Sequence, residues 1–232
     1  SLRNSVVRFD PTSPRRMASI DIGTNTILLL IAEVEGGKLK PLLEKETVVR
    51  LGEGLQENGI LSKEAMNRGL QTLAQYLEQC QAMKVQEIFA AGTSALREAK
   101  NSEDFLKWVK EKLNLSIEVI SGEEEAQLSF LAVAEDLQER EKSILVVDVG
   151  GGSTEFILGK GDQIKRWISL ALGSVRFTEQ FLRSDPVQEE EWGAMERKIW
   201  EHLANIPHSA EPVSMVAVGG TATTLASVEQ GL

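Results

Sequence analysis

The fold is decided by the stretch Val146–Val147–Asp148–Val149–Gly150–Gly151–Gly152–Ser153–Thr154–Glu155–Phe156–Ile157–Leu158. An apolar, β-branched run ends at one aspartate, three glycines follow, and a second apolar run begins. Because the residues after the glycines favour a strand, the stretch predicts strand, tight turn, strand. This pattern excludes a dinucleotide-binding loop, whose glycines open a helix, and a P-loop, which requires a following Gly-Lys-Ser/Thr.

The glycine turn has the composition of a phosphate-binding loop. Its glycines at 150–152 let the backbone approach a ligand closely, so that several N–H groups can point at one phosphate. Asp148 and Glu155 flank the turn and are suited to hold a hard cation, directly or through water. The alternative is a plain hairpin with a flexible tip, which requires neither three glycines nor flanking acids.

A weak repeat links this turn to an earlier one. The segment Asp21–Ile22–Gly23–Thr24–Asn25–Thr26 also follows an apolar strand and leads into another, 127 residues before the matching Asp148. Strands alternate with helices elsewhere in the chain, which is typical of an α/β fold. We therefore expect two related α/β domains, over residues 17–140 and 141–232, each with a phosphate-binding hairpin that faces a shared cleft.

The composition limits the classes of function. The chain has 232 residues, 42% of them apolar, which is enough for one large domain or two small ones. With 25 basic and 35 acidic residues the net charge is −10, so nucleic-acid binding is not expected. The longest apolar run, Ile27 to Ala32, is too short to span a membrane. The single cysteine, Cys80, fits a reducing compartment, and we expect a cytoplasmic protein.

Residues 1–16 differ from the rest of the chain. They carry four arginines, two prolines and one acid, without hydrophobic periodicity and without the apolar region of a signal peptide. We expect a disordered tail or upstream read-through, with a transit-like segment as the alternative, and a folded body that begins at Met17.

Three glutamates begin a predicted helix at Ser121–Gly122–Glu123–Glu124–Glu125–Ala126. Ser121 and Glu124 have capping-box spacing, and Glu123 suits the positive end of the helix dipole. Glu125 has no such structural duty. It is therefore a candidate general base for a water molecule, an effect worth about 10²–10⁴-fold in rate. The alternative is a solvated, acidic helix start.

Three further segments are candidates for binding phosphate or starting a helix. Arg97 lies just after a predicted strand and has the planar, permanently charged fork that matches phosphate, although an exposed helix arginine is the alternative. The segment Gly219–Gly220–Thr221–Ala222–Thr223–Thr224 opens a helix whose free N–H groups suit a phosphate. We interpret Gly173–Ser174–Val175–Arg176 as a structural helix start with a basic residue nearby.

From Met17 to about Leu225, the chain resembles the exopolyphosphatase/guanosine pentaphosphate phosphatase family, also called Ppx/GppA. The resemblance is carried by six motifs that occur in the expected order. Four of them begin at Asp21, Ser121, Asp148 and Gly219. The other two are Gly92–Thr93–Ser94–Ala95–Leu96–Arg97–Glu98–Ala99 and Leu172–Gly173–Ser174–Val175–Arg176. The resemblance implies the two-domain, ribonuclease H-like ATPase fold of actin, sugar kinases and Hsp70. It also implies Mg²⁺-dependent hydrolysis of the terminal phosphate of inorganic polyphosphate, or of the 5′ γ-phosphate of pppGpp.

The resemblance also implies roles for individual residues. Glu125 matches the family's proposed catalytic base, and Asp148 and Glu155 match its metal- and water-positioning acids. The remaining expected site residues bind phosphate: Asp21, Gly23, Thr24, Asn25, Arg97, Gly150, Gly151, Gly152, Ser153, Gly220 and Thr221. We expect a metal and backbone donors to neutralise the terminal phosphate while Glu125 activates water for in-line attack.

The expected ligands are inorganic polyphosphate or guanosine penta- and tetraphosphate, with Mg²⁺ and, as a further option, a monovalent cation such as K⁺. No nucleic-acid or membrane partner is expected, and a homodimer is left open. Two alternatives remain, a non-catalytic polyphosphate- or ppGpp-binding chain and an actin-like kinase or ATPase. Family members continue well past the Gly-Thr-Ala-Thr-Thr motif, whereas this chain stops at Leu232, so we expect an incomplete second domain.

Overall fold

The computed structural model describes residues 14–137, 142–204, 206 and 213–231. The strands are β1 (Arg15–Ile22), β2 (Thr26–Glu35), β3 (Lys38–Val48), β4 (Glu87–Gly92), β5 (Glu118–Val119), β6 (Ser143–Val149), β7 (Thr154–Lys160), β8 (Gln163–Leu170) and β9 (Ser214–Val218). The helices are α1 (Leu55–Asn58), α2 (Lys63–Ala82), α3 (Ser94–Glu98), α4 (Ser102–Leu113), α5 (Gly122–Leu137), α6 (Ser174–Phe181), α7 (Glu189–Leu203) and α8 (Gly220–Gln230). No helix among these residues has the length and apolar character needed to cross a membrane.

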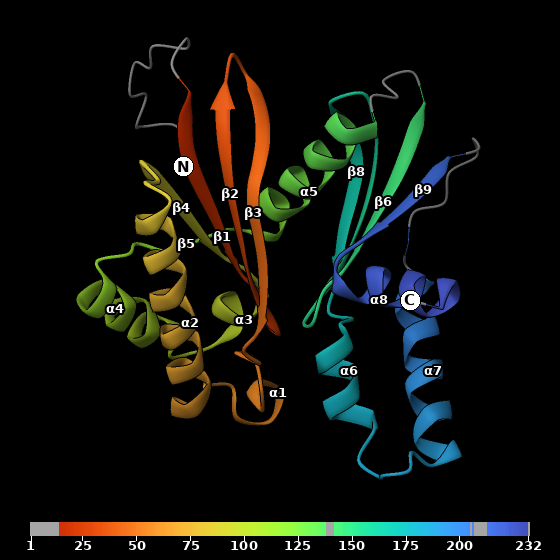
Figure 1. Cartoon of the computed structure of the whole chain (residues 1–232). Coiled ribbons are helices and arrows are strands. Elements are labelled where there is room, and N and C mark those ends of the chain that lie inside the picture. The colour runs from red at the N-terminus through yellow and green to blue at the C-terminus, as the bar shows by residue number, and fades with distance from the viewer. Residues whose placement is uncertain (1–13, 138–141, 205, 207–212, 232) are drawn as a thin grey trace.

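The strands form two sheets of the same plan, which stand side by side in Figure 1. The first sheet has the order β3-β2-β1-β4-β5, and the second has the order β8-β7-β6-β9. Each begins with an antiparallel meander of three strands, after which a parallel strand pairs with the first strand of the meander. We call the first sheet with α1–α4 the first lobe, and the second sheet with α5–α8 the second lobe.

The larger core lies on the face of the first sheet that α2 and α4 cover. Ile20 and Ile22 of β1 and Leu29 of β2 are buried there, as expected for strands whose alternate side chains face one core. Tyr76 of α2 donates its hydroxyl to the carbonyl of Ile27 at 3.0 Å, which ties the helix to the end of the first hairpin. Helix α2 is thus hydrogen-bonded to the sheet next to the turn that leads into β2.

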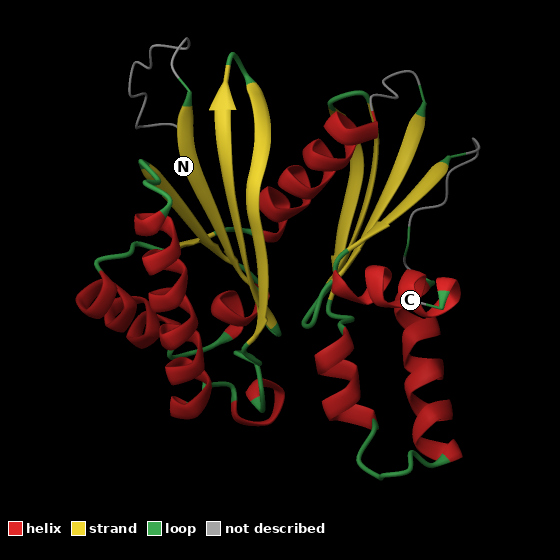
Figure 2. Cartoon of the chain, viewed as in Figure 1, coloured by secondary structure: helices red, strands yellow, loops and turns green. Residues whose placement is uncertain are grey.

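The smaller core lies between the second sheet and helix α5. Phe130 of α5 is fully buried and packs with Val146 of β6 and Ile157 of β7. Its ring lies over Gly159, where a Cβ would overlap it. Figure 2 shows α5 as a long red helix next to the second sheet. Packing therefore assigns α5 to the second lobe, whereas the sequence pattern predicts it at the end of a first domain over residues 17–140.

The first strand begins earlier than expected. Arg15 and Arg16 lie in β1 and pair with β2, so the prediction that the folded body begins at Met17 is wrong for these two residues. Arg16 Nη1 also donates to the carbonyl of Met83 at 2.9 Å, which explains why this arginine is part of the body. Residues 1–13 of the expected tail lie outside the described residues.

Candidate active site

The glycine turn between β6 and β7 has its carbonyls occupied and its N–H groups free. Gly150 N donates to the carbonyl of Ser153 at 3.0 Å and closes the turn. The carbonyls of Gly150 and Gly151 accept from the first N–H groups of α6 at 3.0 Å. In the described part of the chain, the N–H groups of Gly151, Gly152 and Ser153 donate to no protein atom. Free N–H groups in a tight turn are the donors that bind an anion.

The turn between β1 and β2 closes in the same way. Gly23 N donates to the carbonyl of Thr26 at 3.0 Å, and an aspartate stands two residues before this first glycine, as it does in the second turn. The carbonyls of Thr24 and Asn25 accept from backbone N–H groups of the loop after β3 at 2.8 Å. The weak repeat in the sequence is therefore a repeat of structure.

The tips of the two turns pack against each other at the junction of the lobes. A Cβ on Gly151 would lie 3.3 Å from the Cβ atoms of Thr24 and Asn25. A Cβ on Gly152 would overlap Ser94 Oγ and lie 2.8 Å from Thr24 Oγ1. Thr24 Oγ1 is buried and has no hydrogen-bond partner among the described residues. The contact between the lobes therefore requires glycines at 151 and 152.

Asp148 of β6 and Glu155 of β7 form a pair of carboxylates. They stand opposite each other in the sheet register, so both side chains lie on one face. Ser129 of α5 donates to Asp148 Oδ2 at 2.8 Å, and Ser169 of β8 donates to Glu155 Oε1 at 2.6 Å. Burial raises the pKa of both groups, that of Glu155 to about 7, and the serine hydrogen bonds oppose part of the shift.

Glu125 and Arg97, which the sequence predicts as base and phosphate ligand, are in contact. Arg97 Nη1 lies 2.7 Å from Glu125 Oε2 and also donates to the carbonyl of Ile120 at 3.0 Å. Burial raises the pKa of Glu125, and the charge of Arg97 opposes that shift. The neighbouring Glu124 instead caps its own helix, because it accepts from Ser121 N at 2.9 Å and its N–H donates to Ser121 Oγ at 3.2 Å.

Asp21 completes a group of four carboxylates. Burial, followed by the charges of Glu125 and Asp148, raises the pKa of Asp21 to about 6. The same two charges also raise the pKa of Glu155. Among the described residues, Arg97 is the basic side chain that contacts this group, and no three His, Cys, Asp or Glu side chains are close enough to hold a metal by themselves. The group has an excess of negative charge, which favours a cation supplied from outside.

The second glycine motif opens α8 beside these carboxylates. Gly219 has a φ of 89°, and a Cβ on it would lie 3.0 Å from Asp148 Oδ1. Gly220 and Thr221 therefore begin the helix close to Asp148, with the free N–H groups of a helix N-terminus. The predicted site residues of both halves thus meet where the lobes meet.

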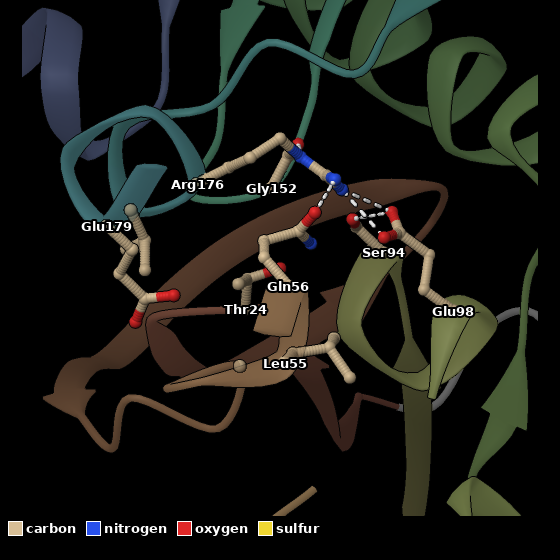
Figure 3. A pocket seen from close by; sticks show the side chains of 10 residues that line it. Thr24, Leu55, Gln56, Ser94, Glu98, Gly152, Arg176 and Glu179 are labelled. Carbon is tan, nitrogen blue, oxygen red and sulfur yellow. Dashed lines mark hydrogen bonds and ion pairs between the residues drawn. The ribbon is translucent and has the colours of Figure 1, made fainter. Parts of the chain in front are cut away.

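Three residues at the site are absent from the sequence prediction. Ser129 lies one helical turn after Glu125, and Ser169 is the cross-strand partner of Glu155, so both have a signal in their spacing. Arg176 is interpreted from the sequence as part of a structural helix start, yet its side chain reaches the first lobe (Figure 3). No local pattern predicts that contact, because its partners lie far away in the sequence.

Comparison with known proteins gives a family and close relatives. A model described as the Ppx/GppA phosphatase family matches residues 30–231. The bifunctional 3-dehydroquinate synthase/phosphatase of Fusobacterium nucleatum subsp. nucleatum is 38% identical over 225 residues, which covers 92% of this chain and 34% of that protein. The chain thus spans about a third of the length of this curated relative.

Solved structures show the same fold. The Ppx/GppA family member of Aquifex aeolicus has a TM-score of 0.75 at 38% identity, and the match covers 95% of this chain and 71% of that one. An exopolyphosphatase from Cytophaga hutchinsonii has a TM-score of 0.87 at 31% identity, with 94% and 70% covered. The two-sheet α/β fold of the actin-like class, expected from the sequence, is therefore confirmed.

Proposed function

The chain belongs to the Ppx/GppA phosphatase family, and we propose that it is a Mg²⁺-dependent phosphohydrolase that removes the terminal phosphate of inorganic polyphosphate or the 5′ γ-phosphate of pppGpp. The proposal rests on one observation. The turn with free N–H groups adjoins the carboxylates that include Glu125, so donors for a phosphate and acceptors for a water proton lie together.

The phosphate is bound by neutral donors and one arginine. The N–H groups of Gly151, Gly152 and Ser153 donate to oxygens of the terminal phosphate, with further donors from the start of α8. Arg97 adds a permanent charge in the fork geometry that matches phosphate. This use of backbone donors suits a chain whose net charge is −10, since few basic side chains are then required.

Glu125 is the general base. Its carboxylate is held in place by Arg97 at 2.7 Å, and burial keeps its pKa above the ordinary value for glutamate. A base of raised pKa removes a proton from an attacking water more effectively than an ordinary glutamate does. When a phosphate oxygen binds to Arg97, Glu125 loses part of its charge partner, which increases its basicity at the moment when the substrate is in place.

The carboxylate pair fits Mg²⁺. Mg²⁺ prefers oxygen ligands and is usually held by one or two carboxylates, with water and substrate phosphate completing the shell. Asp148 and Glu155 supply two oxygen donors on one face of the sheet, next to the phosphate turn. When bound, Mg²⁺ would neutralise charge on the transferred phosphate. Ser129 and Ser169 hold the two carboxylates in place for that contact.

The reaction is an in-line displacement. Glu125 takes a proton from water, the water oxygen forms a bond to the terminal phosphorus, and the bond from that phosphorus to the bridging oxygen breaks. The shortened polyphosphate or ppGpp leaves with the bridging oxygen, and inorganic phosphate is released. The N–H groups of the turn stabilise the charge on the equatorial oxygens as it develops.

The test is phosphate release from medium-chain polyphosphate with Mg²⁺, with pppGpp as the second substrate. We expect the Glu125→Gln variant to lose about 10²–10⁴-fold in rate. The matched control is Glu124→Gln, the adjacent residue that serves the helix cap, and its rate should stay close to that of the parent. Equal rates for Glu125→Gln and the parent would exclude Glu125 as the base.

The other outcomes separate the alternative functions. Binding of polyphosphate or ppGpp without turnover by a folded parent would favour a non-catalytic binding protein. Hydrolysis of ATP in preference to polyphosphate would favour an actin-like kinase or ATPase. Loss of phosphate release on removal of Mg²⁺ with a chelator, and its return on addition of Mg²⁺, would support the metal requirement.

A further inference from the structure

Arg176 of α6 connects the two lobes through hydrogen bonds to both (Figure 3). Its Nε donates to the carbonyl of Gly152 at 2.6 Å, within its own lobe. In the first lobe, its Nη1 donates to Gln56 of α1, and its Nη2 lies 2.6 and 2.7 Å from the two carboxylate oxygens of Glu98 on α3. We call these four residues the interlobe clamp.

The clamp links the two phosphate-binding elements. On one side, α6 begins directly on the glycine turn, because its first N–H groups hold the carbonyls of Gly150 and Gly151. On the other side, Glu98 is the neighbour of Arg97 on α3, and Ser94 of the same helix donates to Glu98 at 3.0 Å. A side chain that ties Gly152 to Glu98 therefore fixes the turn relative to Arg97.

The clamp is a multiply hydrogen-bonded contact around a mostly buried arginine and not an exposed ion pair. The side chain of Arg176 is only 11% exposed, whereas surface arginines are mostly solvated. Each of its three side-chain nitrogens has its own acceptor. The planar guanidinium can donate to all of these acceptors at once, whereas a lysine ammonium on its flexible stem cannot. A second contact supports it one helical turn along α6, where Glu179 Oε1 accepts from Gly54 N at 3.1 Å.

We propose that Arg176 is a positioning residue that holds the lobes together at the base of the site and thereby sets the distance between the phosphate turn and Arg97. Its effect on hydrolysis rests on the proposed function, whereas its effect on the lobes does not. A bound phosphate that bridges the turn and Arg97 needs this distance to be correct, and a misplacement of about 1 Å can cost about 10²-fold in rate.

The first experiment measures the distance between the lobes in the full chain. Spin labels are attached to Gln71→Cys on α2 and Glu196→Cys on α7, both exposed, after Cys80 is replaced by alanine. Arg176→Ala is expected to shift the distance distribution by several ångströms or broaden it, because the clamp is lost. The matched control is Arg166→Ala, an exposed arginine of β8, which should leave the distribution unchanged.

The second experiment measures kcat and KM for phosphate release from polyphosphate. Arg176→Ala should lower kcat/KM about tenfold or more, mainly through kcat. Arg176→Lys, which keeps the charge but only part of the contacts, should recover part of the loss. Glu98→Gln removes the charge of the first-lobe partner of Arg176, at a side chain that is half-exposed. This variant tests the same contact if Arg176→Ala fails to fold.

The outcomes are distinguishable. A changed distribution with reduced kcat in Arg176→Ala, absent in Arg166→Ala, supports the proposal. An unchanged distribution in the folded Arg176→Ala and Glu98→Gln proteins overturns it, and so does a loss confined to KM, because that result assigns Arg176 to substrate contact. A parent that releases no phosphate contradicts the proposed function, and the distance measurement then still decides on the clamp.

Discussion

The two hairpin turns share a backbone and differ in chemistry. Both close with the same N–H to carbonyl bond at 3.0 Å, and both follow an aspartate by two residues. In the second sheet the residue opposite Asp148 is Glu155, whereas in the first sheet the residue opposite Asp21 is Leu28. The second hairpin therefore carries a pair of carboxylates, and the first hairpin carries one.

The tips of the turns differ as well, and the contact between them explains why. Thr24 and Asn25 of the first turn project side chains into the junction, where Gly151 and Gly152 of the second turn leave room for them. At so close an approach, side chains on one tip require glycines on the other. The same backbone turn thus packs with its side chains at the junction in the first lobe, whereas in the second lobe it carries the free N–H groups of the proposed phosphate loop.

The largest expected effect comes from replacing the two aspartates. Asp148→Asn should reduce phosphate release by about 10²–10³-fold, since it removes a charged ligand from the carboxylate pair beside the phosphate turn. Asp21→Asn should cost about tenfold or less, because no second carboxylate stands opposite it. Both rates are measured under saturating Mg²⁺ and polyphosphate. Equal losses would mean that the two hairpins contribute alike to the reaction.

The next largest effect concerns the tips. Gly152→Ala should reduce the rate about 10²-fold and lower the free energy of unfolding by about 1–3 kcal/mol, because the new methyl group overlaps Ser94 Oγ. Asn25→Ala, at the equivalent position of the first turn, removes atoms and inserts none, so its cost should be smaller on both measures. Urea unfolding measures the change in stability of each variant, and the phosphate assay measures the change in rate. A harmless Gly152→Ala would show that the tips are not in contact.

The carboxylates should make folding depend on pH in the metal-free protein. The pKa of Glu155 is raised to about 7 and that of Asp21 to about 6, so the folded state keeps protons that the unfolded chain has already released. Folding stability should therefore fall as pH rises from about 4.5 to 7. Thermal unfolding of the parent and of Glu155→Gln should show a flatter profile for the variant. Asp21→Asn should flatten a narrower range that ends near pH 6.

Mg²⁺ provides a second readout of the same carboxylates. A bound cation favours the ionised carboxylates, so Mg²⁺ should stabilise the parent more at a pH of about 8 than at a pH of about 5.5. This difference should be lost in Glu155→Gln. A parent whose stability is independent of Mg²⁺ at both pH values would contradict the assignment of Asp148 and Glu155 as its ligands.

The smallest expected effect is at the support of Asp148. Ser129 donates to this aspartate, whereas Asp21 has no such hydroxyl partner among the described residues. Ser129→Ala should lower the rate only a few-fold. It should also shift the acidic limb of the pH–rate profile to higher pH, by about one pH unit at most, because Asp148 loses a hydrogen bond that favours its charged form. The control is Ser116→Ala, an exposed serine of the first lobe, which should leave the profile unchanged. A profile that also stays unchanged in Ser129→Ala would mean that Asp148 does not titrate in the rate.

Much of the fold was predictable because its signals are local. The Asp-x-Gly repeat, the capping box at Ser121 and Glu124, and the alternation of strands and helices each act over a few residues, and all appear in the structure. The packing of α5 was not predictable in this way. Its apolar face indicates a helix on a sheet, but local spacing does not say which of two sheets it covers.

The site was predictable in its residue types and less so in its contacts. Gly150 and Asp148 stand out by chemistry and position, whereas the Arg97–Glu125 ion pair joins residues 28 apart and the Arg176–Glu98 contact joins residues 78 apart. Such contacts depend on how the lobes meet. The roles of these residues, the metal, the cytoplasmic location and a homodimer stay predictions.

The packing of α5 has a mechanical consequence. Glu125 lies on a helix that packs on the second sheet, while Arg97 belongs to α3 of the first lobe, so their 2.7 Å contact spans the two lobes. Any opening of the lobes lengthens that contact and removes the counter-charge from Glu125. The protonation state of Glu125 would therefore change with the angle between the two lobes.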